Sequence, residues 1–124
     1  MTLQRRALGQ QAEELAVRLF EGQGFTIAFR NWRRPQGELD IVATKDGTCV
    51  FVEVRSRTGD QQGHALETVT ASKRAQVIRA ARLFLSEESL PAREYRFDVV
   101  AVTFDEGGQV RDCQHVPAAF DTHE

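Results

Sequence analysis

The sequence lacks long hydrophobic runs and has no excess of charge of either sign. No stretch of its 124 residues approaches the roughly 20 consecutive apolar residues of a membrane-spanning helix. With 16 basic and 18 acidic residues the net charge is −2, so binding to nucleic acid would need a local basic patch. The N-terminal residues contain no apolar segment typical of a secretory signal peptide. We therefore expect a cytoplasmic protein that does not associate with membranes.

Cysteine and proline are also scarce. Cys49 and Cys113 are the only two cysteines, and they lack the short spacing of a metal-binding motif. We expect both to be reduced and to act as small apolar side chains. The sequence has no repeats and no Pro- or Gly-rich linker, and 41% of its residues are hydrophobic. These features predict one globular domain over residues 1–124.

Two segments have apolar residues at helical spacing. The first covers residues 8–20 and is ended by Gly22 and Gly24. The second is capped by Thr70 or Ser72 and has a predicted buried face of Val77, Ile78, Ala81, Phe84 and Leu85. Both segments are therefore predicted to pack one face against a sheet.

Runs of β-branched and aromatic residues predict the strands. Residues 25–30 and 94–104 are predicted strands, residues 31–37 a turn, and residues 109–116 a weaker last strand. Residues 56–69 are predicted to form a polar loop. With the hairpin described next, the order is α-β-β-β-α-β-β, which favours a mixed sheet with helices packed on it.

A hairpin is predicted over residues 37–57, where two apolar strands flank an Asp-Gly pair. This pair is typical of a two-residue type I′ turn. With that turn, cross-strand pairing places Asp40 opposite Glu53 and Glu38 opposite Arg55. Directly opposed like charges are destabilising. We therefore expect a positive group between the two carboxylates.

Side-chain alternation gives this hairpin one aliphatic and one acidic face. The aliphatic face, expected to lie under a helix, comprises Leu39, Ile41, Ala43, Val50, Val52 and Val54. On the acidic face, two interpretations of the Asp40–Glu53 pair remain open. In one, Arg55, Arg57 or a basic residue from a helix neutralises the acids. In the other, the two carboxylates bind Mg²⁺ or Mn²⁺, which completes its coordination with water and phosphate.

These residues resemble the signature of the PD-(D/E)XK nuclease superfamily, with Asp40 and then Glu53-Val54-Arg55 in the motif positions. More closely, the sequence resembles the YraN-like (UPF0102) family of small bacterial proteins. The resemblance extends from Gly9 to about Phe104 and rests on AEELAVRLF, GELDIVA, FVEVRSR and RFDVV in this order. It implies an α/β fold with a restriction-endonuclease-like core, α-β-β-β-α-β, related to archaeal Holliday-junction resolvases.

The resemblance also implies site residues. Asp40 and Glu53 become catalytic residues and ligands of Mg²⁺ or Mn²⁺, and an acid of the first helix, Glu14 or Glu13, becomes a further ligand. For Glu14, a plain solvated helix acid is the alternative. Glu38 is either an outer-shell ligand of the metal ion or the partner of Arg55, and we favour the pairing with Arg55.

Arg55 departs from the superfamily pattern, which has lysine at this position. Arginine does not release its proton in proteins, so it cannot activate a water molecule as a neutral lysine can. Its guanidinium can hold a phosphate oxygen with two hydrogen bonds and stabilise charge that develops on a phosphoryl group. Arg55 is therefore our third candidate catalytic residue, as a phosphate clamp.

Basic residues outside the hairpin arms supply candidate phosphate contacts. The nucleic-acid-binding candidates are Lys73, Arg57 and Arg34. Ordinary solvated charge is the alternative for Arg57 and Arg34, whereas Lys73 is favoured because the resemblance includes a lysine in the second helix. Trp32 is either a base-stacking or a core residue. Asp98 is interpreted first as a structural partner of Arg96 or another arginine, and second as support for the site.

The predicted function is a metal-dependent endonuclease, or a nuclease-like protein, acting on DNA phosphodiester bonds, structured DNA included. The alternatives are a non-catalytic nucleic-acid-binding module with the same fold and a structural or protein-interaction domain. A homodimer is compatible with the sequence, which does not set the oligomeric state.

Overall fold

The structure of the protein is a computed structural model that describes residues 3–59 and 65–122. The elements follow in the order α1 (Leu3–Gly22), β1 (Thr26–Arg34), β2 (Gly37–Lys45), β3 (Thr48–Thr58), the 3-10 helix η1 (Ala65–Thr68), α2 (Ala71–Glu87), β4 (Glu94–Phe104) and β5 (Val110–Phe120). The predicted order of helices and strands is confirmed. The predicted loop over residues 56–69 contains the end of β3 and η1, and its residues 60–64 lie outside the described part.

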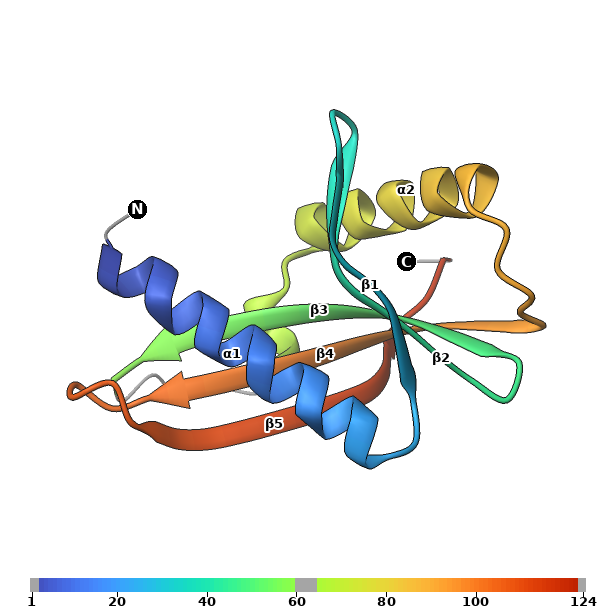
Figure 1. Ribbon diagram of the computed structural model, residues 1–124. Helices are drawn as coiled ribbons and strands as arrows, with labels where there is room; N and C mark the ends of the chain where they lie inside the picture. Colours follow the sequence, from blue (N-terminus) through green and yellow to red (C-terminus); the bar gives the residue numbers. More distant parts are fainter. Residues whose placement is uncertain (1–2, 60–64, 123–124) are drawn as a thin grey trace.

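The five strands form one sheet in the order β1-β2-β3-β4-β5. β3 and β4 are parallel, and the other neighbours are antiparallel. The helices α1 and α2 cover opposite faces of this sheet, and both begin toward the side where β3 and β4 end (Figure 1). The mixed sheet flanked by helices is thus confirmed. No described helix is long and apolar enough to cross a membrane.

Each face of the sheet has its own hydrophobic core. Beneath α2, Phe84 is the centre of an aromatic cluster, with the rings of Phe29, Trp32 and Phe51 edge-on to it at 5.2, 5.4 and 5.8 Å between centroids. Beneath α1, the core includes Ala12, Ala16, Phe20, Ile41, Val50, Val52, Val100 and Val102. The helical faces predicted from periodicity are therefore the buried ones, and Trp32 is a core residue with 5% exposure.

Two strands are longer than predicted. β1 continues through Arg34, so the prediction that residues 31–37 form a turn was wrong. The added segment is held because Trp32 pairs with Leu39 and packs in the core beneath α2. β5 likewise continues to Phe120, which stacks on Phe97 at 5.0 Å. Burial of an aromatic side chain offsets the cost of ordering each extension.

The predicted hairpin register is correct as far as the Ile41–Val52 pair. Beyond it, β2 leaves β3 and pairs only with β1, forming a two-stranded arm of residues 32–39 that lies beside α2 (Figure 1). The bend coincides with Asn31, whose φ of 52° is in the left-handed region. Because of this bend, Leu39 packs in the core beneath α2. The prediction that Leu39 shares the face of Ile41 was therefore wrong.

Gly37 seats the arm on α2, and its replacement tests that contact. Its φ is +154°, and a Cβ there would lie 3.3 Å from both the Ala80 side chain and the Gln76 carbonyl. We expect Gly37→Ala to lower the free energy of unfolding by about 1–3 kcal/mol. Gly9→Ala is the control, since it is helical with nothing within 4 Å, and it should stabilise by about 0.5–1 kcal/mol. Urea unfolding measures both, and an unchanged Gly37→Ala variant would contradict close packing of the arm.

Candidate active site

Asp40 and Glu53 lie together where β2 separates from β3. The backbone N–H of Val54 donates to Asp40 Oδ2 at 2.8 Å, so a carboxylate takes the place of a strand partner. Glu53 is 3% exposed, and it lies close enough to Asp40 for the charge of that carboxylate to raise its pKa. The sequence thus predicted the neighbouring carboxylates, although the backbone pairing of these two residues is not part of the β2–β3 ladder.

Burial and mutual repulsion disfavour two negative charges in this pair. Burial raises the pKa of Glu53 to about 8, and the charge of Asp40 acts in the same direction. Burial also raises the pKa of Asp40, against the opposing effect of the Val54 N–H. Without another cation, the pair is therefore most stable when it retains a proton.

Two cationic side chains approach Glu53 from different elements. Arg55 Nη1 on β3 and Lys73 Nζ on α2 each lie 3.7 Å from Glu53 Oε1. Lys73 is in the first turn of α2, where its backbone N–H donates to the N-cap Thr70 Oγ1 at 3.2 Å. The first interpretation of the acidic pair, neutralisation by Arg55 or by a basic residue from a helix, thus finds its basic neighbours, whereas the metal interpretation stays a prediction.

Glu38 does not make the predicted pair with Arg55. Arg33 Nε on β1 donates to Glu38 Oε2 at 3.1 Å, because β2 has already left β3 at this position and faces β1 alone. That prediction was wrong. Arg55 is consequently directed to Glu53 and to the adjoining cleft.

The acids of α1 are held by the bend in β1. Arg30 donates to Glu14 Oε1 at 2.7 Å and to Glu13 Oε1 at 3.1 Å, and Asn31 donates to Glu13 at 2.8 Å. Glu13 lines the same cleft as Asp40. The side chain of Glu14 is 54% exposed and is not among the cleft-lining residues. Of the two acids, the structure brings Glu13 nearer to the site, and a ligand role for Glu14 stays a prediction.

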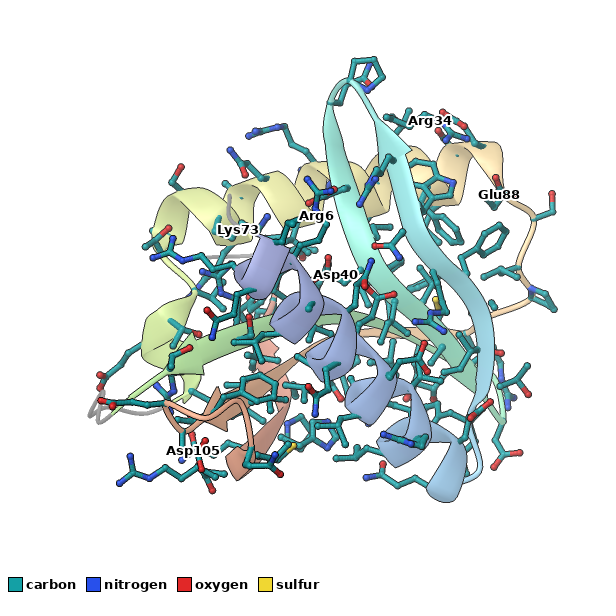
Figure 2. All side chains as sticks on the ribbon, turned by 60° about the vertical axis from the view of Figure 1, so that its left-hand side comes forward. Arg6, Arg34, Asp40, Lys73, Glu88 and Asp105 are labelled. Carbon is teal, nitrogen blue, oxygen red and sulfur yellow. The ribbon has the colours of Figure 1, made fainter. Side chains whose placement is uncertain are left out.

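A cleft of about 1070 Å³ opens above Asp40 and is lined by arginines from α1, β1 and β3. These are Arg5, Arg6, Arg33, Arg55 and Arg57. In Figure 2, Arg6, near the start of α1, and Lys73, near the start of α2, are both drawn above and to the left of Asp40. These arginines form a local basic patch although the net charge of the chain is −2. Arg57 lies in this patch, as predicted.

Arg34 does not join this cleft. It donates to Glu87 on α2 at 2.8 Å and lies over the Trp32 ring, 4.2 Å from the centroid. Arg5 and Arg6 do line the cleft, and the sequence analysis did not identify them as candidates. The signal available was that these two arginines enter the first turn of α1 with no acidic residue, where positive charge is unfavourable beside the helix dipole.

The donor set restricts how a metal ion is held. Among residues 3–59 and 65–122, no three His, Cys, Asp or Glu side chains gather as a metal-binding group. Two adjoining carboxylates, of which Asp40 lines the cleft and Glu53 is buried beside it, nevertheless fit a hard cation such as Mg²⁺, which commonly has one or two protein carboxylates and otherwise water or phosphate ligands. Asp40 and Glu53 are those carboxylates.

The raised pKa of Glu53 predicts a pH-dependent stability. The folded protein binds this proton more tightly than the unfolded chain, whose glutamate keeps its ordinary value of 4.5. Stability is therefore greatest below that value and is lost as the pH rises toward about 8. In EDTA, the loss should amount to a few kcal/mol, and Glu53→Gln should reduce it strongly. Thermal unfolding of the wild type and of Glu53→Gln from about pH 5 to 8 gives the dependence of stability on pH for each protein. The same dependence in both would contradict the raised pKa of Glu53.

Comparison with known proteins gives the family of the chain. The uncharacterised protein family UPF0102 matches residues 12–102. A UPF0102 protein of Syntrophotalea carbinolica is 43% identical over 121 residues, covering 98% of this chain and 97% of the relative. One from Chloroflexus aurantiacus is 44% identical over 120 residues, covering 96% and 97%. The matched segment runs from the middle of α1 through most of β4 and includes the paired carboxylates, so the chain belongs to the UPF0102 family.

Proposed function

We propose that the protein is a metal-dependent endonuclease that hydrolyses DNA phosphodiester bonds. The observation that carries the proposal is a pair of adjoining carboxylates, the half-buried Asp40 and the buried Glu53, beside a cleft lined by five arginines. The α-β-β-β-α-β order of the first six regular elements, η1 aside, agrees with a restriction-endonuclease-like core. In that core, the acidic motif lies on the two strands that correspond to β2 and β3.

The cleft arginines position the DNA backbone. They come from three separate elements, and each can donate two hydrogen bonds to phosphate oxygens. Arg5 and Arg6 also lie beside the positive end of the α1 dipole, which strengthens the local attraction for anions. A DNA strand in the cleft therefore has a phosphate held next to Asp40.

Asp40 and Glu53 would hold Mg²⁺ or Mn²⁺, which when bound supplies positive charge for the reacting phosphate and a more acidic water ligand. In the hydrolysis, a water oxygen forms a bond to phosphorus while the ester P–O bond breaks, leaving a phosphate end and a hydroxyl end. Arg55 remains charged and can clamp a phosphate oxygen next to the carboxylates. Lys73 approaches Glu53 from α2 and can contact phosphate or orient the attacking water.

A non-catalytic DNA-binding module is the second candidate, and Arg55 is the observation that favours it. Since Arg55 replaces the superfamily lysine and arginine keeps its proton, the side chain at this motif position cannot act as a proton acceptor. The cleft and its arginines serve both functions equally. Cleavage, rather than binding, distinguishes them.

Replacement of Glu53 tests catalysis. Glu53→Gln keeps the side-chain shape but removes a carboxylate, so cleavage of supercoiled and branched DNA with Mg²⁺ or Mn²⁺ should fall by at least about 100-fold. DNA affinity measured in EDTA should change little. Millimolar Mn²⁺ should raise the melting temperature of the wild type but not of Asp40→Asn with Glu53→Gln. No cleavage by the wild type on any substrate, with retained binding, would favour the binding module.

Replacement of cleft arginines tests DNA binding. Arg6→Ala and Arg55→Ala should each weaken binding across sequences and reduce the slope of log affinity against log salt by about one. Arg82→Ala is the control, because Arg82 is exposed on α2 and absent from the cleft lining. Fluorescence anisotropy at several salt concentrations gives the slopes. Equal effects for all three variants would indicate nonspecific attraction and argue against the cleft.

A further inference from the structure

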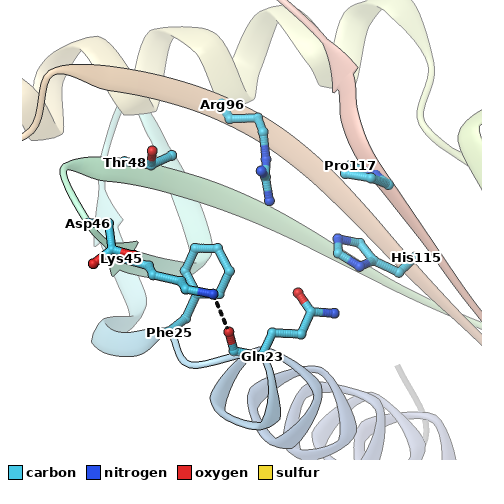
Figure 3. Close-up of a pocket in the computed structure, with 8 residues that line it drawn as sticks. All are labelled: Gln23, Phe25, Lys45, Asp46, Thr48, Arg96, His115 and Pro117. Atoms are coloured by element: carbon cyan, nitrogen blue, oxygen red, sulfur yellow. Dashed lines mark hydrogen bonds between the residues drawn. The ribbon is translucent and has the colours of Figure 1, made fainter.

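A second cavity lies near the β2–β3 turn, away from the arginine-lined cleft, and the proposed hydrolysis does not use it (Figure 3). It measures about 480 Å³ and is bounded by β2, β3, β4, β5 and the end of α1. Its lining includes three nitrogen bases or cations from three strands, namely Lys45, Arg96 and His115. The two clefts have no lining residue in common.

Asp98 organises the wall of this cavity. It is fully buried and accepts hydrogen bonds from Arg96 Nε at 2.8 Å, Arg96 Nη2 at 2.9 Å and Ala118 N at 3.0 Å, while His115 Nε2 lies 2.8 Å from Oδ2. Burial alone would raise the pKa of Asp98, but these partners hold it below its usual value. An ionised carboxylate therefore fixes a guanidinium and an imidazole at the cavity surface, as the first interpretation of Asp98 anticipated for Arg96.

A strained bulge in β5 accompanies this arrangement. Val99 pairs with Val116 and Phe97 with Phe120, so three residues of β5 lie opposite Asp98 alone. Ala118, in the bulge, has a φ of 49°, which costs an L-residue roughly 1–2 kcal/mol. Bulges and strained residues of this kind concentrate at functional sites because they redirect side chains and backbone donors. Here the bulge directs the Ala118 N–H to Asp98 and places Pro117 on the cavity wall.

The cationic groups converge on one ring. Lys45 Nζ is 5.6 Å and Arg96 Cζ is 5.8 Å from the centroid of Phe25. Lys45 Nζ donates to the Gln23 carbonyl at 2.6 Å, which leaves an ammonium with two further hydrogens. Among the described residues, Arg96 Nη1 has no hydrogen-bond acceptor, since its two bonds to Asp98 use Nε and Nη2.

We propose that this cavity binds a phosphate group, either free or carried by a nucleotide. Lys45 and Arg96 supply charge-assisted donors and the Thr48 hydroxyl a neutral one, a combination suited to an anion with several oxygens. The volume exceeds that of a phosphate ion, so an attached organic group has room. Asp46, the acid of the lining, is drawn beside Lys45 in Figure 3, on the side away from His115.

An NMR titration tests this site directly. Inorganic phosphate and AMP should each shift the backbone amide signals of Phe25, Lys45 and Thr48 in the full chain, whereas adenosine should not. Stronger binding of AMP than of phosphate identifies a nucleotide as the source, and equal binding identifies free phosphate. No shift at about 10 mM of either probe, a weak affinity for charge-assisted contacts, overturns the proposal. Shifts confined to residues around Arg55 and Arg57, or equal shifts with adenosine, overturn it as well.

Variants separate the cavity from general surface charge. Lys45→Ala should weaken phosphate binding about tenfold, the loss expected for one charge-assisted hydrogen bond. Arg82→Ala removes the same charge from exposed α2 and should leave the affinity unchanged. Arg96→Ala removes a partner of buried Asp98 and can unfold the region, so Thr48→Val serves as the second variant and should weaken binding while the amide spectrum stays folded. Wild-type affinity in both Lys45→Ala and Thr48→Val overturns the proposal.

Discussion

The hydrogen bond from the Val54 backbone to the Asp40 carboxylate is the contact on which the candidate site depends. The β2–β3 ladder ends at Ile41–Val52, and a strand that leaves a sheet exposes backbone donors that need new partners. Asp40 provides one with its side chain. The separation of the strands and the position of the carboxylate are thus a single structural feature. A neutral apolar residue at position 40 would remove both the acceptor and the acid.

The two helices complete this site from opposite faces of the sheet. α1 brings Arg5, Arg6 and Glu13 to the cleft, and α2 brings Lys73 to Glu53. Both helices begin toward the side where β3 ends (Figure 1), and the first turn of each carries basic residues of the site: Arg5 and Arg6 on α1 and Lys73 on α2. Concentrating arginines there is unfavourable for the isolated protein because like charges repel. An anionic partner would offset that repulsion.

Buried carboxylates behave in opposite ways in the two cavities. Glu53 is buried beside the half-buried Asp40, and the repulsion between the two carboxylates adds to the effect of burial, so the pKa of Glu53 rises to about 8. Asp98 is buried just as deeply, but Arg96, His115 and the Ala118 N–H surround it and its pKa falls. The first arrangement disfavours ionisation of both carboxylates. In the second, hydrogen-bond donors stabilise the ionised carboxylate, so the difference lies in the neighbours.

Local sequence patterns were sufficient to predict the order of the elements, the buried faces of both helices, the Asp-Gly turn with its register to Ile41–Val52, and the nearness of Asp40 to Glu53. Each of these follows from local chemistry: periodicity, capping, turn preference and the two-residue repeat of a strand. Only the tertiary structure decided the bend at Asn31, which sends Leu39 to α2, pairs Glu38 with Arg33 and moves Arg34 away from the cleft. It also brought Arg5 and Arg6 to Asp40 and Arg96 and His115 to Asp98. Those contacts join residues that are far apart in the chain or that lie on either side of a change of strand direction. Packing, strand twist and charge together decide such contacts, and no short stretch of sequence reveals the outcome.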